Sequence, residues 1–295
     1  MPELPEVETV RSGLEPVLRG RRFLRVEQRR KDLRFPLPER FAERLTGRRV
    51  VAVERRAKYL LIHLDGAEVL VVHLGMTGRF TVSERRGVDG CILGDYTYEH
   101  GSDTRHDHVV FTMSGGATIT YNDARRFGFM TLIPENRLSQ HEYFEDLGVE
   151  PLSKELDAAY LAARALGKKV DLKAFLMDQR IVAGLGNIYV CEALFRAGLD
   201  PWKPAARLAT STGRPTSHAR RLVDAIKTVL ADAIRAGGST LRDYKQADGS
   251  SGSFQHSFQV YGREGEACAR SRCRGVVRRK TQGGRSTFYC PNCQR

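Results

Sequence analysis

The first residues of the chain place an amine nucleophile next to carboxylates. Pro2 follows Met1, and Glu3 and Glu6 come shortly after it. Methionine aminopeptidase removes an initiator methionine that precedes a small residue, so we expect the mature chain to begin with the secondary amine of Pro2. A terminal amine titrates near pH 8, against about 10.4 for lysine, so a much larger fraction of it is neutral and able to attack at pH 7.

Two interpretations of this N-terminus are compatible. Addition of the amine to a carbonyl carbon yields a charged iminium, which acidifies the neighbouring C–H, and Glu3 and Glu6 could transfer the protons that an elimination then needs. Pro5 and the acidic residues also suit the first turn of a helix, whose apolar stripe runs over residues 7–18. Pro16 should bend or end that helix, which would hold the terminus against a core.

The composition indicates a globular protein with a polyanionic partner. The chain has 295 residues, 41% of them hydrophobic, which is enough for two domains with real cores. It carries 48 Lys and Arg against 35 Asp and Glu, a net charge of +13, and its sequence pI is about 9.7. Nucleic acid is the first candidate partner. An arginine-rich proteome would also raise the pI, so charge alone does not decide.

The sequence contains neither a membrane span nor a secretory signal. No run approaches the roughly 18 apolar residues that a membrane helix needs, and the N-terminus lacks a basic segment followed by an apolar one. We therefore expect a cytoplasmic protein without membrane contact. Disulfides are improbable in that compartment, so metal binding is the better explanation for clustered cysteines.

Four cysteines near the end of the chain have the spacing of a zinc ribbon. Cys268 and Cys273 form one pair, Cys290 and Cys293 form the other, and a segment long enough for a hairpin separates them. Because all four ligands would come from protein, we expect one zinc ion with a structural role. The ribbon is also rich in Lys and Arg and has no acidic residue after Glu266. The remaining cysteines read as ordinary apolar residues.

The region from residue 21 to residue 133 has the pattern of an antiparallel β-structure. Short apolar runs separated by glycines and polar clusters predict strands over residues 23–26, 50–53, 59–64, 68–73, 109–112, 117–121 and 129–133. Three loops between them, residues 55–59, 73–78 and 122–128, combine arginine or lysine with Met or an aromatic residue. Such loops suit a protein that grips phosphates and wedges a side chain between bases, although their aromatics could equally cover the core. Residues 83–105 read as a long surface loop.

After Pro151 the apolar spacing becomes helical. We expect a second domain with helices over residues 156–166, 172–178, 188–197 and 217–236. Glycines and Asn187 precede the third of these, with Asn187 as the expected N-cap, and a helix start of this kind attracts phosphate. Residues 237–252 read as a loop, and the aromatic residues of 254–261 predict one strand of a hairpin.

Six features together resemble bacterial formamidopyrimidine-DNA glycosylases, and the resemblance spans the whole chain. They are PELPEVET at residues 2–9, RRAKYLL at 55–61, HLGM at 73–76, DARRFG at 123–128, GLGNIY at 184–189 and the four-cysteine ribbon. Leu4 favours this branch over the related endonuclease VIII type, which usually has glycine there and prefers oxidised pyrimidines. The first cysteine pair has four intervening residues where the family usually has two, and the 83–105 loop is longer than usual.

The resemblance implies an α+β, multidomain fold. It consists of an N-terminal antiparallel β-sandwich domain over residues 1–134, a helix-two-turn-helix domain over 135–262 and a zinc ribbon over 263–295. The loop 237–252 would cover the extruded base. The family relationship also implies a monomer that acts on damaged double-stranded DNA and associates with the bacterial nucleoid through DNA.

The implied activity is base-excision repair. An enzyme of this family removes 8-oxoguanine and formamidopyrimidines and then cleaves the abasic strand by β,δ-elimination. Pro2 matches the Schiff-base nucleophile and Glu3 the catalytic acid/base, while Lys58 matches the lysine of β-elimination and Arg285 the arginine of δ-elimination.

The resemblance also assigns DNA contacts. The side chains that match those filling the void left by the flipped nucleotide are Met76, Arg125 and Phe127. Contacts to the DNA backbone are expected from His106, Arg125, Lys169 and Asn187. Two other functions compete, a non-catalytic zinc-ribbon DNA-binding protein and an RNA-binding zinc-ribbon protein of the translation machinery, but neither explains the Pro2-Glu3 pair.

Overall fold

The chain forms two compact units. The computed structural model describes residues 2–84, 104–239 and 253–295, so most of the 83–105 loop and residues 240–252 lie outside the described part. An N-terminal unit comprises Met1–Phe144 with Ala236–Ser253, and a C-terminal unit comprises Glu145–Arg235 with Phe254–Arg295. Contacts therefore group the helical segment with the ribbon. The domain boundaries at residues 134 and 262 remain predictions.

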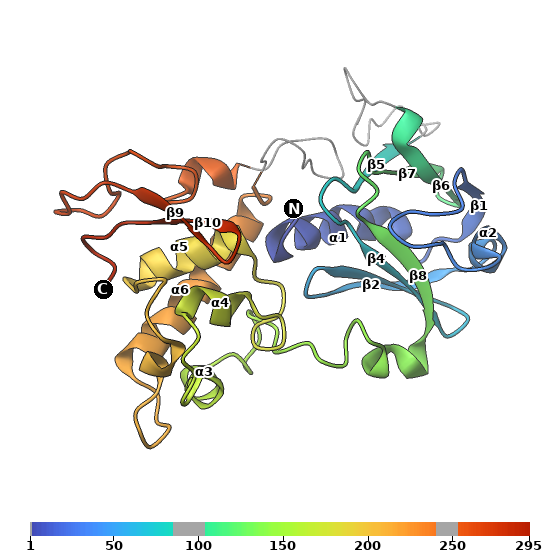
Figure 1. Ribbon diagram of the computed structural model, residues 1–295. Helices are drawn as coiled ribbons and strands as arrows, with labels where there is room; N and C mark the ends of the chain where they lie inside the picture. The colour runs from blue at the N-terminus through green and yellow to red at the C-terminus, as the bar shows by residue number, and fades with distance from the viewer. Residues whose placement is uncertain (1, 85–103, 240–252) are drawn as a thin grey trace. The chain divides into compact units, whose positions relative to one another are not determined.

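The N-terminal unit contains two four-stranded antiparallel sheets, which confirms the predicted antiparallel β-structure (Figure 1). One sheet has the strand order β1-β6-β7-β5, with bounds Phe23–Gln28, Asp107–Met113, Ala117–Asn122 and Arg79–Glu84. The other has the order β2-β3-β4-β8, with bounds Val50–Arg56, Tyr59–Leu64, Glu68–His73 and Phe129–Pro134. Each strand predicted between residues 21 and 133 is present, and strand β5 was not predicted.

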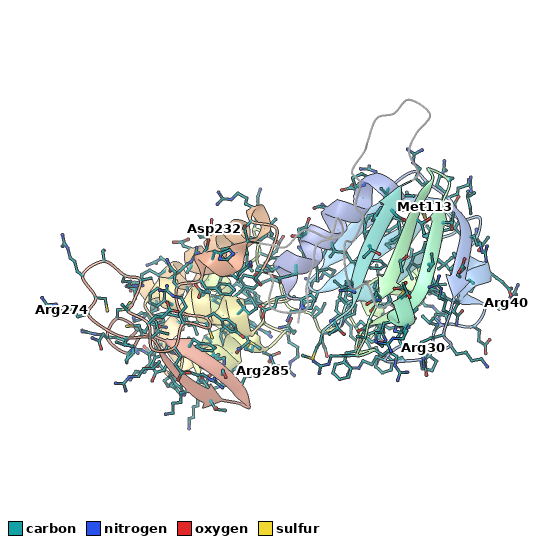
Figure 2. All side chains as sticks on the ribbon, turned by 90° about the horizontal axis from the view of Figure 1, so that it is seen from above. Arg30, Arg40, Met113, Asp232, Arg274 and Arg285 are labelled. Carbon is teal, nitrogen blue, oxygen red and sulfur yellow. The ribbon has the colours of Figure 1, made fainter. Side chains whose placement is uncertain are left out.

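Helix α1 (Leu4–Leu18) joins the core of this unit. Its buried face includes Val7, Val10 and Leu14, and the helix packs against β2 and β3. The helix continues through Pro16 and ends two residues later at Leu18, so Pro16 does not itself end the helix. A short helix, α2 (Phe41–Leu45), packs beside β1. Figure 2 shows Arg30 and Arg40 at the exposed periphery of this unit, whereas the buried Met113 lies on the sheet.

The C-terminal unit combines four α-helices with a two-stranded hairpin in the part of the chain described. The helices are α3 (Ala158–Ala165), α4 (Leu172–Met177), α5 (Asn187–Ala197) and α6 (Ser217–Arg235), and the hairpin strands are β9 (Arg278–Gln282) and β10 (Arg285–Tyr289). Asp157 and Asp171 cap α3 and α4 by accepting hydrogen bonds from the backbone N–H groups of Tyr160 and Ala174. None of the helices within the described ranges has the length and hydropathy to cross a bilayer.

The segment after residue 253 differs from the expected strand. Phe254–Ser257 forms a 3-10 helix, and the residues that follow are irregular. The rings of Phe254 and Phe258 lie 5.7 Å apart, and Phe254 also contacts Tyr189 at 5.9 Å. The aromatic residues thus pack into a helical core instead of alternating across a strand.

A fully buried carboxylate holds the backbone after this 3-10 helix. Glu192 on α5 accepts hydrogen bonds from the consecutive N–H groups of Gln259, Val260 and Tyr261, at 2.9–3.1 Å. Successive N–H groups that point at one anion replace the water that a charged group loses on burial. The carboxylate therefore connects α5 to the chain that leads into the ribbon.

We expect Glu192→Gln to lower the free energy of unfolding of the C-terminal unit by about 2 kcal/mol, because the amide loses the charge and turns an N–H₂ toward backbone donors. Urea unfolding followed by the fluorescence of Trp202, the only tryptophan, would measure the change. Glu264→Gln, at an exposed position, is the control. Equal unfolding midpoints for both variants would contradict the role of Glu192.

Candidate active site

The residues next to the proposed nucleophile are buried at the start of α1. Pro2 is buried, and Glu3 and Glu6 are 4% and 2% exposed. Glu3 is the N-cap residue of α1, and its backbone N–H donates to Oε2 of Glu6 at 2.9 Å. Oε1 of Glu6 accepts from both the N–H and the hydroxyl of Ser239, each at 2.9 Å. Both Glu6 oxygens thus accept hydrogen bonds within the protein, and the Glu3 side chain in turn accepts the backbone N–H of Glu6 in a capping box.

The backbone at Ser239 is shaped to fit against Glu6. Gly238 has φ +78°, and a Cβ built there would lie 3.2 Å from Cγ and Oε1 of Glu6. Ser239 forms an isolated antiparallel bridge with Ser253, whose N–H donates to the carbonyl of Ala236 at 3.0 Å. Two chain segments that flank residues 240–252 are therefore joined beside the N-terminus. The central part of the expected base-covering loop lies outside the described residues.

Lys58 lies in the turn between β2 and β3, close to a neutral histidine at the end of β4. Lys58 is 8% exposed and follows Ala57, which adopts φ +53° in the turn between β2 and β3. Burial, and then the charges of Lys58 and Arg34, lower the pKa of His73 to about 4. Nδ1 of His73 accepts the N–H of Gly75 at 3.1 Å, which requires an unprotonated Nδ1. His73 belongs to a motif noted in the sequence, but sequence reasoning gave it no role.

A buried aspartate ties together the two loops that carry the expected void-filling residues. Asp123 is 0% exposed and accepts hydrogen bonds from the Thr77 hydroxyl and from the N–H of Gly128. The Thr77 hydroxyl also accepts from the N–H of Arg125 at 3.2 Å. The N–H of Asp123 donates to the carbonyl of His106 at 3.1 Å, so His106 lies beside the same loop.

The expected void-filling side chains meet at one pocket. A pocket of about 540 Å³ is lined by Leu33, Arg34, His73, Gly75, Met76, Arg125, Arg126 and Phe127. The guanidinium carbon of Arg125 lies 4.6 Å from the ring centroid of Phe127, which is 43% exposed. Gly75 has φ +62°, and a Cβ there would lie 2.3 Å from the backbone of Gly128, so the two loops require glycine at their contact. Arg34 was not singled out from the sequence.

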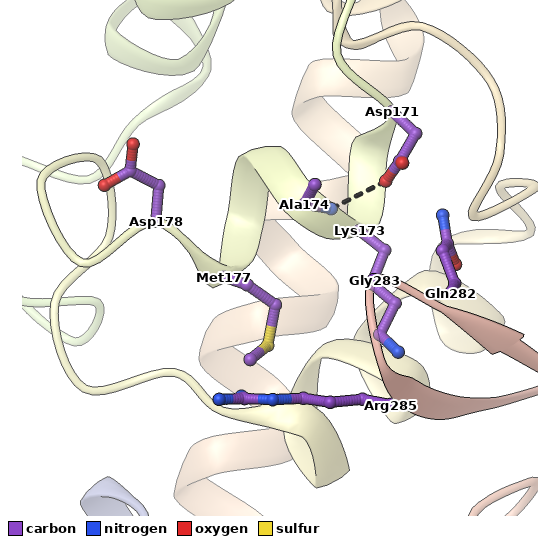
Figure 3. Close-up of a pocket in the computed structure, with 8 residues that line it drawn as sticks. All are labelled: Asp171, Lys173, Ala174, Met177, Asp178, Gln282, Gly283 and Arg285. Carbon is purple, nitrogen blue, oxygen red and sulfur yellow. Dashed lines mark hydrogen bonds between the residues drawn. The ribbon is translucent and has the colours of Figure 1, made fainter.

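The C-terminal unit holds the other predicted site residues. Arg285 is exposed at the start of β10, and Asn187 donates from Nδ2 to the carbonyl of Ser286 at 2.9 Å. Asn187 is the first residue of α5 and Gly186 is its N-cap, so the predicted N-cap was misplaced by one residue. Lys169 is exposed in the segment before the Asp171 cap. Arg285 lines a pocket of about 350 Å³ with residues of α4 (Figure 3).

The four cysteines of the ribbon converge as the spacing predicts. Their Sγ atoms all lie within 4.8 Å of one another, with Cys268 and Cys293 3.7 Å apart and Cys273 and Cys290 3.8 Å apart. Arg272 is one of the four residues between Cys268 and Cys273, and it adopts a left-handed φ of +66° directly before Cys273. Burial and the adjacent cysteines raise the pKa of Cys293, as expected where clustered thiolates need a cation. The donor set fits one structural zinc ion.

We expect Cys290→Ser to lose zinc and affinity for DNA together, because the ribbon is too small to fold without its metal. Elemental analysis would measure zinc, and fluorescence anisotropy would measure DNA binding. Cys191→Ser is a matched control, since Cys191 is buried in the same cluster of apolar residues but is not among the four converging cysteines. Normal DNA binding by Cys290→Ser would contradict the prediction.

Comparisons with known proteins agree over the whole chain. Family models match in order the formamidopyrimidine-DNA glycosylase N-terminal domain at residues 1–130, its H2TH domain at 147–245 and a zinc finger found in FPG and IleRS at 265–295. The formamidopyrimidine-DNA glycosylases of Bradyrhizobium sp. (strain BTAi1) and Chelativorans sp. (strain BNC1) are each 58% identical to it, with 100% of both chains covered.

Solved structures show the same fold. The MutM (Fpg) protein of Thermus thermophilus matches with a TM-score of 0.81 and 39% identity, covering 99% of this chain and 98% of that one. Lactococcus lactis Fpg in complex with DNA that contains an abasic site matches with a TM-score of 0.82 and 32% identity over 100% of both chains. The chain belongs to the formamidopyrimidine-DNA glycosylase family, whose members are DNA glycosylases with abasic-site lyase activity.

Proposed function

We propose that this chain excises 8-oxoguanine and formamidopyrimidines from duplex DNA through a Schiff base on Pro2, and then cleaves the abasic strand by β,δ-elimination. The observation that carries the proposal is the buried Pro2-Glu3 pair at the start of α1, held by the hydrogen bonds to Glu6. The names of the relatives support it, as do structures of Lactococcus lactis Fpg with abasic-site and Fapy-dG DNA.

The first chemical step breaks the glycosidic bond. The neutral amine of Pro2 attacks C1′ of the damaged nucleotide while Glu3 transfers a proton to the sugar or the departing base. The target carbon is inaccessible in stacked DNA, so the nucleotide must first leave the helix. Met76, Arg125 and Phe127 fill the space left behind, and their shared pocket supports this role.

Two eliminations follow from the iminium. Removal of a C2′ proton, assisted by Lys58, expels the 3′ phosphate, and removal of a C4′ proton, assisted by Arg285, then expels the 5′ phosphate. Neighbouring phosphates are held by His106, Lys169 and Asn187. Zinc holds the ribbon that presents Arg285 and takes no part in bond breaking.

The protein acts as a monomer in the cytoplasm, where DNA binding keeps it on the nucleoid. We assign its three functional parts the boundaries predicted from the sequence, at residues 134 and 262, and assign 237–252 as the base-covering loop. One observation favours a wider range of lesions. Lactococcus lactis Fpg, 33% identical to this chain, also has a structure in complex with DNA that contains an oxidised pyrimidine.

Glu3→Gln should abolish release of 8-oxoguanine while retaining measurable cleavage at a preformed abasic site. An abasic site has already lost its base, so its aldehyde condenses with the amine and needs no acid to protonate a leaving group. Lys58 or water can then accept the acidified proton. Gel assays on two duplexes, one per substrate, would separate the steps, with borohydride trapping on the second. Release of 8-oxoguanine at the wild-type rate would show that Glu3 is not the acid. An adduct on any residue except Pro2 would show that Pro2 is not the nucleophile.

Arg125→Ala should slow excision at least tenfold in duplex DNA and much less in single-stranded DNA, since a void exists only opposite a partner strand. Excision rates on the same lesion in both forms would measure the difference. Arg137→Ala, in the same unit but not among the residues that line the pocket, is the control. Equal losses on both substrates would instead indicate a phosphate contact.

A further inference from the structure

A lysine is buried at the contact between α4 and the zinc-ribbon hairpin. Lys173 is 3% exposed, and its Nζ donates to Oγ1 of Thr287 at 2.6 Å and to the carbonyl of Ser286 at 3.3 Å. Burial lowers the pKa of Lys173 and the charge of Arg285 adds to this effect, whereas Cys191 and Asp171 act in the opposite direction. Within the described part of the chain no carboxylate forms an ion pair with it. Burial of an ammonium without such a partner is costly, so its hydrogen bonds to β10 require an explanation.

The two residues that Lys173 holds come directly after Arg285. Ser286 also receives a hydrogen bond from Nδ2 of Asn187 at 2.9 Å. The hydroxyl of Thr287, which is 0% exposed, donates to Oε1 of Gln282 at 2.9 Å. Side chains from α4 and α5 therefore hold the carbonyl of Ser286, and side chains from α4 and β9 hold the hydroxyl of Thr287.

This arrangement also fixes the direction of Arg285. Side chains two residues apart on a strand point to the same face, so Arg285 and Thr287 share one face of β10. Before Arg285 the chain turns through Gly283 and Gly284, at φ +55° and +73°. Figure 3 shows the Lys173 side chain directed toward this end of the hairpin, and Lys173, Met177 and Arg285 line one pocket.

We propose that Lys173 is a positioning residue for Arg285. Its ammonium pins Ser286 and Thr287 to α4, so the guanidinium at the start of the same strand keeps one position relative to the helix. The consequence is kinetic: Lys173 sets how often an abasic strand that has undergone β-elimination continues to δ-elimination. This inference rests on the proposed role of Arg285 in that second step.

Two substitutions break the link from opposite sides. Lys173→Met keeps the length and apolar stem of the side chain but has no donor. Thr287→Val keeps the shape of threonine and removes the hydroxyl that accepts from Lys173. Residues that act through one interaction are not additive, so the double variant should be no worse than the more impaired single variant.

The experiment uses zinc-loaded protein and a duplex with a preformed abasic site. Gel electrophoresis separates the unsaturated aldehyde 3′ end left by β-elimination from the 3′ phosphate left after δ-elimination. We expect Lys173→Met and Thr287→Val each to lower the ratio of 3′ phosphate to aldehyde about tenfold. Zinc content and the rate of borohydride trapping should stay at wild-type values. Lys203→Met, at an exposed lysine of the same unit, should leave the ratio unchanged.

Arg285→Ala, assayed in parallel, separates two kinds of failure. If it lowers the ratio and Lys173→Met does not, the positioning inference is wrong and the proposed chemistry stands. If Arg285→Ala leaves the ratio at the wild-type value, the role of Arg285 is wrong and the inference falls with it. If Lys173→Met lost zinc or borohydride trapping to the same extent as it lowered the ratio of 3′ phosphate to aldehyde, the positioning inference would also be wrong, because these losses would indicate general unfolding of the hairpin.

Discussion

The hydrogen bonds to the buried carboxylate of Glu6 are the constraint on which the proposed chemistry depends. A chain terminus is ordinarily among the most mobile parts of a protein, yet a nucleophile must be held within a fraction of an ångström of its target. Glu6 binds the N–H of Glu3 on one side and both donors of Ser239 on the other. One side chain thus fixes the residue next to the nucleophile and a backbone segment from far along the chain.

Buried charged groups hold the chain in the same way at three other places in the described part of the structure. Asp123 links two loops at the pocket of Arg125, Glu192 binds three successive N–H groups, and Lys173 pins the strand that carries Arg285. Each is a charged group that is less than 4% exposed and is surrounded by hydrogen-bonding partners. Because an unsatisfied buried charge is far more costly than a satisfied one, each group strongly favours a single local conformation.

The sequence predicted the elements better than the contacts between them. The apolar runs at residues 59–64 and 68–73 are strands with the predicted bounds. The strand predicted from the aromatic residues of 254–261 was wrong, because aromatic residues favour strands yet pack equally well in a helical core. The four cysteines were predictable because a structural zinc ion takes four protein ligands, and two closely spaced cysteine pairs supply them. The sequence suggested Glu6 for proton transfer or for the start of a helix and gave Lys173 no role, because the partners that hold these side chains are 233 and 114 residues away. No local pattern encodes a contact of that separation, so only the structure identifies them.

The proposed steps also depend on different stabilising forces. Pro2, Glu3 and Lys58 belong to a unit whose core is an apolar sandwich, whereas Arg285 is on a hairpin next to four cysteines. The sandwich is held by buried apolar area, which responds mainly to temperature and denaturant. The hairpin is held by thiolate ligation, which responds to chelators, oxidants and acid. The proposed chemistry therefore depends on two parts of the protein that unfold under different conditions. Loss of zinc should weaken DNA binding and displace Arg285 while leaving the surroundings of Pro2 folded.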